Sequence, residues 1–157
     1  MSNQTVKFQY VHGADLGLEK PSRATAGSSG FDLRADLFRL SENSPELRLK
    51  PQESRLVPTG IRIAMQQGLE GQIRPRSGLA AKHNVTVLNA PGTIDSDFRG
   101  ELQVLLINLG QDEFCIRHGD RIAQLVFVAL PGISLELSQD LAQTERGEKG
   151  FGSTGLS

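Results

Sequence analysis

Three observations on the amino-acid sequence predict an all-β fold. Apolar and polar residues alternate along several short segments, which is typical of strands that are buried on one face. Turn residues recur throughout, with 17 Gly and 7 Pro among 157 residues. Convincing helical periodicity is scarce. Many short strands separated by frequent turns indicate a β-barrel or a β-sandwich.

The alternating segments can be placed in chain order. Strands are expected at 5–10, 61–65, 85–87, 101–109, 121–130 and 133–137. In the last of these, Ile133, Leu135 and Leu137 alternate with polar residues. Residues 101–109 and 121–130 become apolar on both faces, which indicates strands that are covered on both sides. One of the two coverings could be another subunit.

A short helix and a tail complete the expected elements. Residues 78–83 could form about two helical turns, with Ser77 as the N-cap. The length of 157 residues suits one domain. We expect a β-barrel domain over 1–143 and a flexible Gly-rich arm over 144–157, because the arm cannot pack a core of its own.

Composition and charge exclude several classes of function. Lys plus Arg is 17 and Asp plus Glu is 18, a balance that argues against nucleic-acid or polybasic membrane binding but leaves a small anionic ligand open. The longest apolar run, 125–130, is far shorter than the roughly 20 residues of a membrane span. No secretion signal is visible, and Cys115 is the only cysteine. A reducing compartment is the default, so we expect a cytoplasmic protein.

Five segments carry polar residues that strands and turns alone do not require. They are 29–36, 74–78, 89–100, 119–125 and 146–155. The second places Arg76, a hydroxyl and backbone amides at a helix start, where anions are stabilised. The third brackets two carboxylates and a ring between glycines, and in the fourth Gln124 interrupts an apolar strand and needs partners for its amide. Each alone could also be a strand edge, a helix cap or a connector.

The fifth segment contains the pattern G-x-G-x-x-G at Gly150, Gly152 and Gly155. A dinucleotide-binding loop needs a helix after this pattern, and only Leu156 and Ser157 follow it. The segment also lacks the Gly-Lys-Ser/Thr ending of a Walker A loop. A strip of this kind could fold over a nucleoside polyphosphate, with its ring on the base and its hydroxyls on phosphate. The alternative is a disordered tail.

In this order and spacing, the five segments resemble the homotrimeric deoxyuridine triphosphatases (dUTPases). The resemblance covers about residues 29 to 155. It implies a distorted jelly-roll β-barrel, a homotrimer with shared active sites, and an arm that closes over the site. It also implies Mg²⁺-dependent hydrolysis of dUTP to dUMP and pyrophosphate, which limits uracil incorporation into DNA and supplies dUMP for thymidylate synthesis.

The resemblance assigns roles to individual residues. Asp95 is similar to the family's water-activating aspartate, which takes a proton as water attacks the α-phosphorus. Asn89 and the backbone of an 88–94 hairpin resemble the uracil reader, and Phe98 the ring beneath the deoxyribose, where Tyr is commoner. Asp32 is implied to act near Mg²⁺ through water, since Mg²⁺ prefers substrate phosphates to a protein cage. The other implied substrate contacts are Arg76, Ser77, Gly78, Gly92, Ile94, Gln124, Arg146, Phe151, Gly152, Ser153 and Thr154.

Three other classes of protein are alternatives to a dUTPase. A dCTP deaminase shares the fold, but its catalytic glutamate lies seven residues after the aromatic, where this chain has Leu105. A non-catalytic dUTPase-like binding module should have lost Asp95 or the tail motif, and both are present. A capsid-like jelly roll leaves the polar segments unexplained. The three histidines match no family role, and Cys115 is expected to be a small core hydrophobe.

Overall fold

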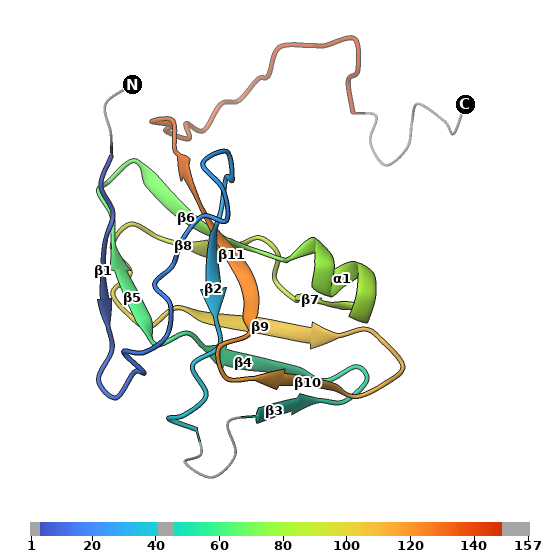
Figure 1. Cartoon of the computed structure of the whole chain (residues 1–157). Coiled ribbons are helices and arrows are strands. Elements are labelled where there is room, and N and C mark those ends of the chain that lie inside the picture. Colours follow the sequence, from blue (N-terminus) through green and yellow to red (C-terminus); the bar gives the residue numbers. More distant parts are fainter. Residues whose placement is uncertain (1–3, 41–45, 149–157) are drawn as a thin grey trace.

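The computed structural model describes residues 4–40 and 46–148, and short strands dominate this part of the chain (Figure 1). The strands are β1 (Lys7–Tyr10), β2 (Phe31–Arg34), β3 (Glu46–Leu49), β4 (Ser54–Pro58), β5 (Ile61–Ala64), β6 (Leu69–Arg74), β7 (Val85–Val87), β8 (Gly92–Ile94), β9 (Gln103–Asn108), β10 (Phe114–Arg117) and β11 (Arg121–Ala129). One helix, α1 (Ser77–His83), lies between β6 and β7 in the described residues. The expected all-β class is confirmed. No described helix is long and apolar enough to cross a membrane.

The described strands form four antiparallel sheets around a shared core. The strand orders are β2-β11-β6-β8, β4-β9-β7, β1-β5 and β3-β10. Hydrogen bonds do not join these sheets into a closed barrel, so the fold is a distorted jelly roll. In Figure 1, β1 and β5 lie at one end of the body, α1 lies at the other, and β3 and β10 cover the bottom.

Alternation along the strands builds the core. In β9, Val104 and Leu106 are fully buried, while Leu105 and Ile107, which alternate with them, are only partly covered. The core is closed at one strand end by Asn108, which is fully buried and whose Nδ2 donates to the carbonyls of Leu49 (2.9 Å) and Asp112 (2.8 Å). Within one chain, therefore, β9 is buried on a single face. The expectation that its other face is also covered, for which another subunit is one candidate, stays a prediction.

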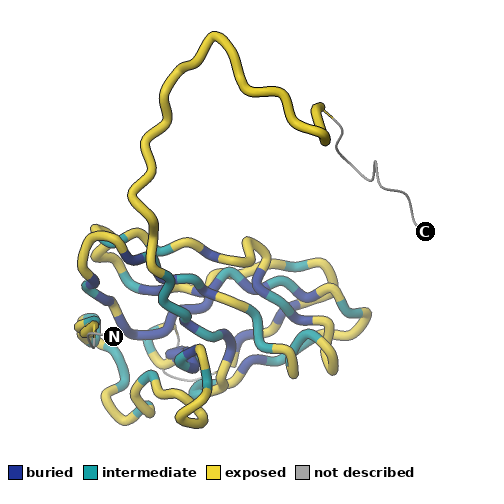
Figure 2. Tube along the Cα trace, turned by 90° about the horizontal axis from the view of Figure 1, so that it is seen from above, coloured by how far each residue is buried: buried dark blue, intermediate teal, exposed yellow. Residues whose placement is uncertain are grey.

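The strand expected at 133–137 is wrong. Leu135 and Leu137 are 99% and 98% exposed, and no strand is assigned there. β11 ends at Ala129, and residues 131–148 run away from the body as an exposed arm (Figure 2). Alternation is typical of a segment that can pair as a strand, but no strand among the described residues pairs with it. The exposed stretch thus begins before the arm expected at 144–157, of which 149–157 lie outside the described residues.

The helix also begins differently from the expectation. Ser77 is the first helical residue, and Arg76, with extended backbone angles (φ −90°, ψ 124°), is the N-cap without a side-chain capping bond. The other expected strands are confirmed with ends shifted by one or two residues. β2, β3, β4, β6, β8 and β10 were not expected as strands, although β3 alternates between apolar and charged residues and β10 is mostly apolar.

His118, which matched no functional role, ties the chain together beside β2. Its Nδ1 accepts from the backbone N–H of Leu37 (3.0 Å), so its Nε2 carries the proton and donates to Asp15 Oδ2 (2.9 Å). A backbone N–H of Gly17 and the contact with His118 lower the pKa of Asp15. The ring also stacks on Phe38, with 3.8 Å between ring centroids. These bonds fix the turn that leads into β11 against the segment that follows β2.

Candidate active site

A polar cluster lies on one face of the four-stranded sheet, where β2, β11 and β6 run side by side. The register places Gln124 between Asp32 on β2 and Arg74 on β6. Gln124 Nε2 donates to Asp32 Oδ1 (3.3 Å), and Arg121 Nη1 donates to Asp32 Oδ2 (3.1 Å). Arg76 Nε lies 3.6 Å from Asp32 Oδ1. We call Asp32, Arg76, Arg121 and Gln124 the Asp32 cluster.

Two local features allow this cluster to form. Gly30 is buried against β11, and a Cβ on it would lie 3.0 Å from Gln124 Cβ, so a side chain here would push the two segments apart. Beside Arg76, the first helical bonds are donated by Leu79 and Ala80, both at 3.1 Å to the Arg76 carbonyl. The amides of Ser77 and Gly78 stand ahead of these bonds. They can therefore donate to an anion next to the Arg76 guanidinium.

Charge distinguishes the cluster from an ordinary sheet surface. Asp32 is 8% exposed, and both of its oxygens face positive or amide donors. Sequence reasoning found Asp32, Arg76 and Gln124 but gave no role to Arg121. The available signal was its position, a lone cation directly after the Gly119–Asp120 turn and before an apolar strand. The structure brings all four residues together.

The second group of predicted residues lies on the Asp95 segment, residues 88–100. β8 pairs with β6, so that Gly92 opposes Ile73 and Ile94 opposes Gly71. Asn89 folds back on this strand, since a Cβ on Gly92 would lie 3.3 Å from Asn89 Nδ2. The Ala90–Pro91 peptide bond is cis.

The expected hairpin over 88–94 is wrong. β7 pairs with β9 in the three-stranded sheet, whereas β8 pairs with β6 in the four-stranded sheet. Residues 88–91 therefore carry the chain from one sheet to the other. Turn residues predict a change of chain direction, but they do not predict which strand the next segment pairs with.

The end of the Asp95 segment holds an exposed carboxylate and an exposed ring. The Phe98 N–H donates to the Asp95 carbonyl (3.1 Å), which closes a turn between them. Phe98 is 41% exposed, and its ring lies on Gly100, where a Cβ would come within 2.5 Å of Phe98 Cζ. Asp95, Asp97, Arg99 and Glu70 line an open cavity of about 640 Å³. Asp95 can thus reach a ligand from solvent.

Within one chain the Asp95 segment and the Asp32 cluster are well separated. Extending the β8 register places Asp95 beside Glu70, four residues along β6 from Arg74, or about 13 Å. Asp32 and Asp95 are also three strand spacings apart across the sheet, or about 14 Å. The two carboxylates are therefore on the order of 20 Å apart, too far to act on one phosphate.

The remaining predicted contacts lie on the arm. Arg146 is described and exposed. Phe151, Gly152, Ser153 and Thr154 lie outside the described residues. The implied roles of these five residues stay predictions.

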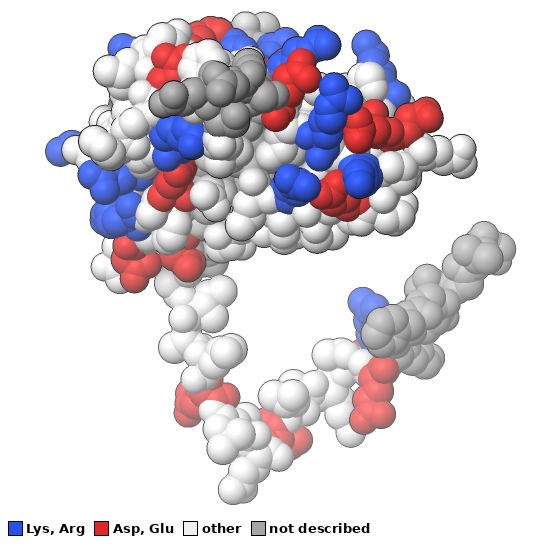
Figure 3. Space-filling view, turned by 90° about the horizontal axis from the view of Figure 1, so that it is seen from below, with Lys and Arg blue, Asp and Glu red and all other residues white. Residues whose placement is uncertain are grey.

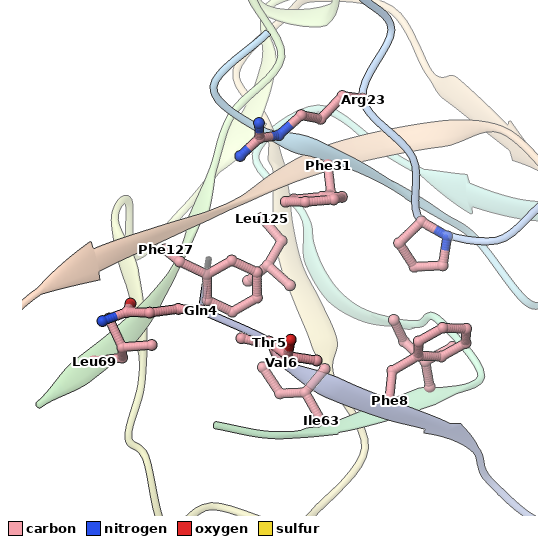
Figure 4. Close-up of a pocket in the computed structure, with 12 residues that line it drawn as sticks. Gln4, Thr5, Val6, Phe8, Arg23, Phe31, Ile63, Leu69, Leu125 and Phe127 are labelled. Carbon is pink, nitrogen blue, oxygen red and sulfur yellow. The ribbon is translucent and has the colours of Figure 1, made fainter. Parts of the chain in front are cut away.

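A larger cavity, of about 870 Å³, lies on the opposite face of the sheet (Figure 4). Phe31 and Leu125 form the cross-strand pair next to Asp32 and Gln124, so their side chains point away from the cluster. Figure 4 shows Phe31, Leu125 and Phe127 around this space, with Arg23 over the Phe31 ring at 4.8 Å. None of the predicted site residues that the structure describes lines it. The cavity is therefore not the candidate active site.

The face seen in Figure 3 carries charges of both signs side by side. Arg48 pairs with Glu113 (2.8 Å) and Arg55 with Glu53 (2.7 Å). Between such pairs Cys115 is partly buried, and burial together with Glu46 raises the pKa of its thiol. A thiol held in its neutral form is a poor nucleophile. The expectation of a core hydrophobe is wrong, because Cys115 is only partly buried and lies outside the buried core. Mixed charge also gives this face no extended basic footprint.

The residues present suit Mg²⁺ only if it arrives with an anionic ligand. Among the described residues, no group of three His, Cys, Asp or Glu is placed to hold a metal ion. Asp32 already faces Arg76 and Arg121, which would repel a bare divalent cation. A bound triphosphate would offset the repulsion between the arginines and the cation, because it brings its own negative charge and oxygen ligands.

The fold and the Asp32 cluster define a β protein with a site suited to a phosphorylated ligand. The family model described as dUTPase matches residues 18–155, and the chain belongs to the dUTPase family. The deoxyuridine 5'-triphosphate nucleotidohydrolase of Roseobacter denitrificans is 48% identical over 157 residues and covers 99% of both chains. The enzyme of the same name from Caulobacter vibrioides is 52% identical over 152 residues, with 96% of this chain and 94% of the relative covered.

Solved structures share the fold. The dUTPase of Staphylococcus bacteriophage 80alpha with dUPNHPP superposes with a TM-score of 0.82 at 23% identity, covering 98% of this chain and 100% of that chain. A mutant dUTPase from phage phi11 of S. aureus, described as coordinating a structural Mg(II) ion, gives a TM-score of 0.73 at 19% identity, covering 88% and 99%. The jelly-roll architecture expected from the sequence is thus confirmed.

Proposed function

We propose that this protein hydrolyses dUTP to dUMP and pyrophosphate, and so limits uracil incorporation into DNA and supplies dUMP for thymidylate synthesis. The observation that carries the proposal is the Asp32 cluster, a buried carboxylate between two arginines and an amide, in a chain that also presents Asp95. Membership of the dUTPase family and relatives with this activity in their name, about half identical to the chain, support it.

The Asp32 cluster would hold the phosphates. Arg76 offers guanidinium donors, which suit phosphate oxygens, and the adjacent amides of Ser77 and Gly78 can donate as well. Gln124 Nε2 is held by Asp32 at 3.3 Å, so the amide is oriented before a ligand arrives. Donors that are already in place lose little freedom on binding and can meet charge as it develops on the leaving pyrophosphate.

Asp95 would be the general base. Its carboxylate would accept a proton from a water molecule as the water oxygen attacks the α-phosphorus in line with the leaving pyrophosphate. The bond from the α-phosphorus to the bridging oxygen breaks, and the electron pair leaves with pyrophosphate. The exposed position of Asp95 on an open cavity supports this role, because both water and substrate can reach it.

The Asp95 segment would also select the nucleoside. Backbone N–H and C=O groups near Asn89, Gly92 and Ile94 would pair with uracil, and cytosine would leave buried groups unpaired because its donor and acceptor are reversed. Phe98 would fill the space of a ribose 2′-hydroxyl. Its ring is held in place by Gly100, which leaves no room for a Cβ beside it. Phe151 on the arm would stack on the base, while Arg146, Ser153 and Thr154 would hold the terminal phosphates.

Mg²⁺ would be carried by the triphosphate and would neutralise its charge, with Asp32 facing it through water. This arrangement agrees with the donor set, which offers no metal cage among the described residues. A cytoplasmic location agrees with the single cysteine, which suits a reducing compartment.

We infer a homotrimer whose sites are shared between chains. In one chain Asp95 lies on the order of 20 Å from Asp32, so the Asp95 segment and the Asp32 cluster would meet only across a subunit interface. The partly exposed apolar residues on the outer faces of β9 and β11 support an interface of this kind.

A dCTP deaminase is the nearest alternative. Its catalytic glutamate would correspond to Leu105, which lies in the middle of β9 and carries no proton-transfer group. The apolar side chain at position 105 therefore favours hydrolysis over deamination. A binding module without turnover is disfavoured by the presence of Asp95.

Product analysis tests the proposal. Purified protein with Mg²⁺ should release pyrophosphate and dUMP from dUTP, and should release no ammonia from dCTP. Ammonia from dCTP would establish the deaminase instead. Tight binding of dUTP with neither product would establish the binding module.

A further inference from the structure

An irregularity in the pairing of β2 with β11 decides where the side chain of Arg121 lies. Gln124 opposes Asp32 and Ala123 opposes Leu33, but Arg121 opposes Arg34. In an unbroken antiparallel ladder Arg121 would oppose Ala35 instead, on the buried face that Leu33 shares. The extra residue between Arg121 and Ala123 is a β-bulge, and it turns Arg121 over to the face of Asp32.

Burial agrees with this reading of the bulge. Ile122 and Ala123 are both buried, at 2% and 0% exposure, so two successive side chains point inward. Arg121 before them is exposed. A regular strand would alternate, and it would bury the guanidinium next to Ala35, which is fully buried. Bulges often serve to re-aim a side chain beside a functional site.

Arg121 is linked to Arg76 in two ways, by a direct hydrogen bond and through Asp32. Its backbone carbonyl accepts a hydrogen bond from Arg76 Nη1 (3.0 Å). Its own Nη1 donates to Asp32 Oδ2 (3.1 Å), while Arg76 Nε faces the other oxygen, Oδ1, at 3.6 Å. The carboxylate is therefore divided between two cations. The structure records no partner for Arg76 Nη2 among the described residues.

We propose that Arg121 is a positioning residue that keeps Arg76 available for substrate phosphate. A buried carboxylate with a single arginine forms a close, two-pronged pair with it. By holding Asp32 Oδ2, Arg121 prevents this pair, so Arg76 stays loosely held and can turn its donors to a triphosphate. The inference rests on the proposed function, because it names the anion that Arg76 meets. It adds a residue to which the resemblance gives no role.

A double-mutant cycle tests this role. Arg121→Gln should weaken binding of the imido analogue of dUTP, with Mg²⁺ present, by about 10- to 100-fold, since Arg76 is then captured by Asp32. KM for dUTP should rise similarly, while kcat changes by less than about threefold. In an Asp32→Asn background the same change should alter binding by less than about threefold, because no carboxylate remains to capture Arg76.

Controls separate this role from the alternatives. Arg74→Gln removes a cation whose Nε and Nη2 bond to Gln72 rather than to Asp32, and it should leave binding within about threefold. Arg121→Lys, which keeps the charge, should recover part of the affinity and replaces Arg121→Gln in the cycle if that variant does not fold. An equal loss of affinity in the wild-type and Asp32→Asn backgrounds would show that Arg121 itself contacts the phosphate. An unchanged affinity would show that Arg121 neither positions Arg76 nor contacts the phosphate. Either result overturns the proposal.

Wild-type turnover is the reference that keeps the two hypotheses distinguishable. If wild-type protein binds and hydrolyses dUTP but the cycle is additive, the role of Arg121 is wrong and the proposed function stands. If wild-type protein neither binds the analogue nor releases pyrophosphate, the proposed function is wrong and the role of Arg121 is overturned with it.

Discussion

The Asp32 cluster and the Asp95 segment are built in opposite ways on the same sheet. Asp32 pairs with Gln124 next to a β-bulge, is nearly buried, and has both oxygens paired inside the chain. Asp95 follows a three-residue strand, is exposed, and borders open space. The cluster is held together by contacts within one chain, whereas the groups of the Asp95 segment face open space.

This difference divides the work of the proposed enzyme. The Asp32 cluster would recognise phosphate, which every nucleoside triphosphate carries. The Asp95 segment would recognise uracil and deoxyribose and would activate the water. Substitutions in the cluster should therefore affect all nucleotides alike, and substitutions in the segment should affect the chemical step or the choice of nucleoside.

Asp95→Asn should have the largest effect. The amide cannot accept the proton of the attacking water, so kcat for dUTP should fall by about 10²- to 10⁴-fold while the nucleotide still binds. Steady-state kinetics and binding of the imido analogue to the same preparation measure the two quantities. A kcat within about threefold of wild type would remove Asp95 from the chemical step.

Deletion of residues 146–157 should have the next largest effect. Loss of the Phe151 stack alone, worth about 1–3 kcal/mol, lowers kcat/KM by about 5- to 150-fold, and lost phosphate contacts add to this. Thermal stability should barely change, because the described part of the arm is exposed and buries no core. A large fall in melting temperature without ligand would contradict this account of the arm.

Phe98→Ala should have a smaller effect, confined to the sugar. Removal of the ring opens the space for a 2′-hydroxyl, so the preference for dUTP over UTP should fall by about tenfold or more. Arg76→Gln is the matched variant from the Asp32 cluster, and it should lower kcat/KM for both nucleotides by the same factor. If Phe98→Ala leaves the ratio of the two kcat/KM values unchanged, Phe98 does not read the sugar.

Much of the Asp32 cluster could be predicted from the sequence, since an amide within an apolar strand and an arginine before a helix are visible as departures from a regular pattern. Arg121 could not be predicted this way. Its orientation depends on a bulge, which is set by how two strands far apart in the chain pair with each other. Local alternation around Arg121 carries no sign of that pairing.

The errors have the same physical origin. Residues 133–137 alternate like a strand, yet a strand also needs a neighbouring strand, and the described part of the chain supplies none. Residues 88–91 have the composition of a hairpin turn, yet the strands on either side pair in different sheets. Periodicity predicts which faces are apolar, and only the tertiary structure decides what covers them.

The sharing of one site between chains is the central claim, and a mixture of two inactive variants tests it most directly. Asp95→Asn and the deletion of residues 146–157 are denatured together in equal amounts and refolded. In random trimers a site is whole when its Asp95 comes from a deletion chain and its arm from an Asp95→Asn chain. Each condition has a probability of about one half, so about a quarter of wild-type activity should return. If trimers are confirmed by light scattering and no activity returns, Asp95 and the arm of each site belong to one chain.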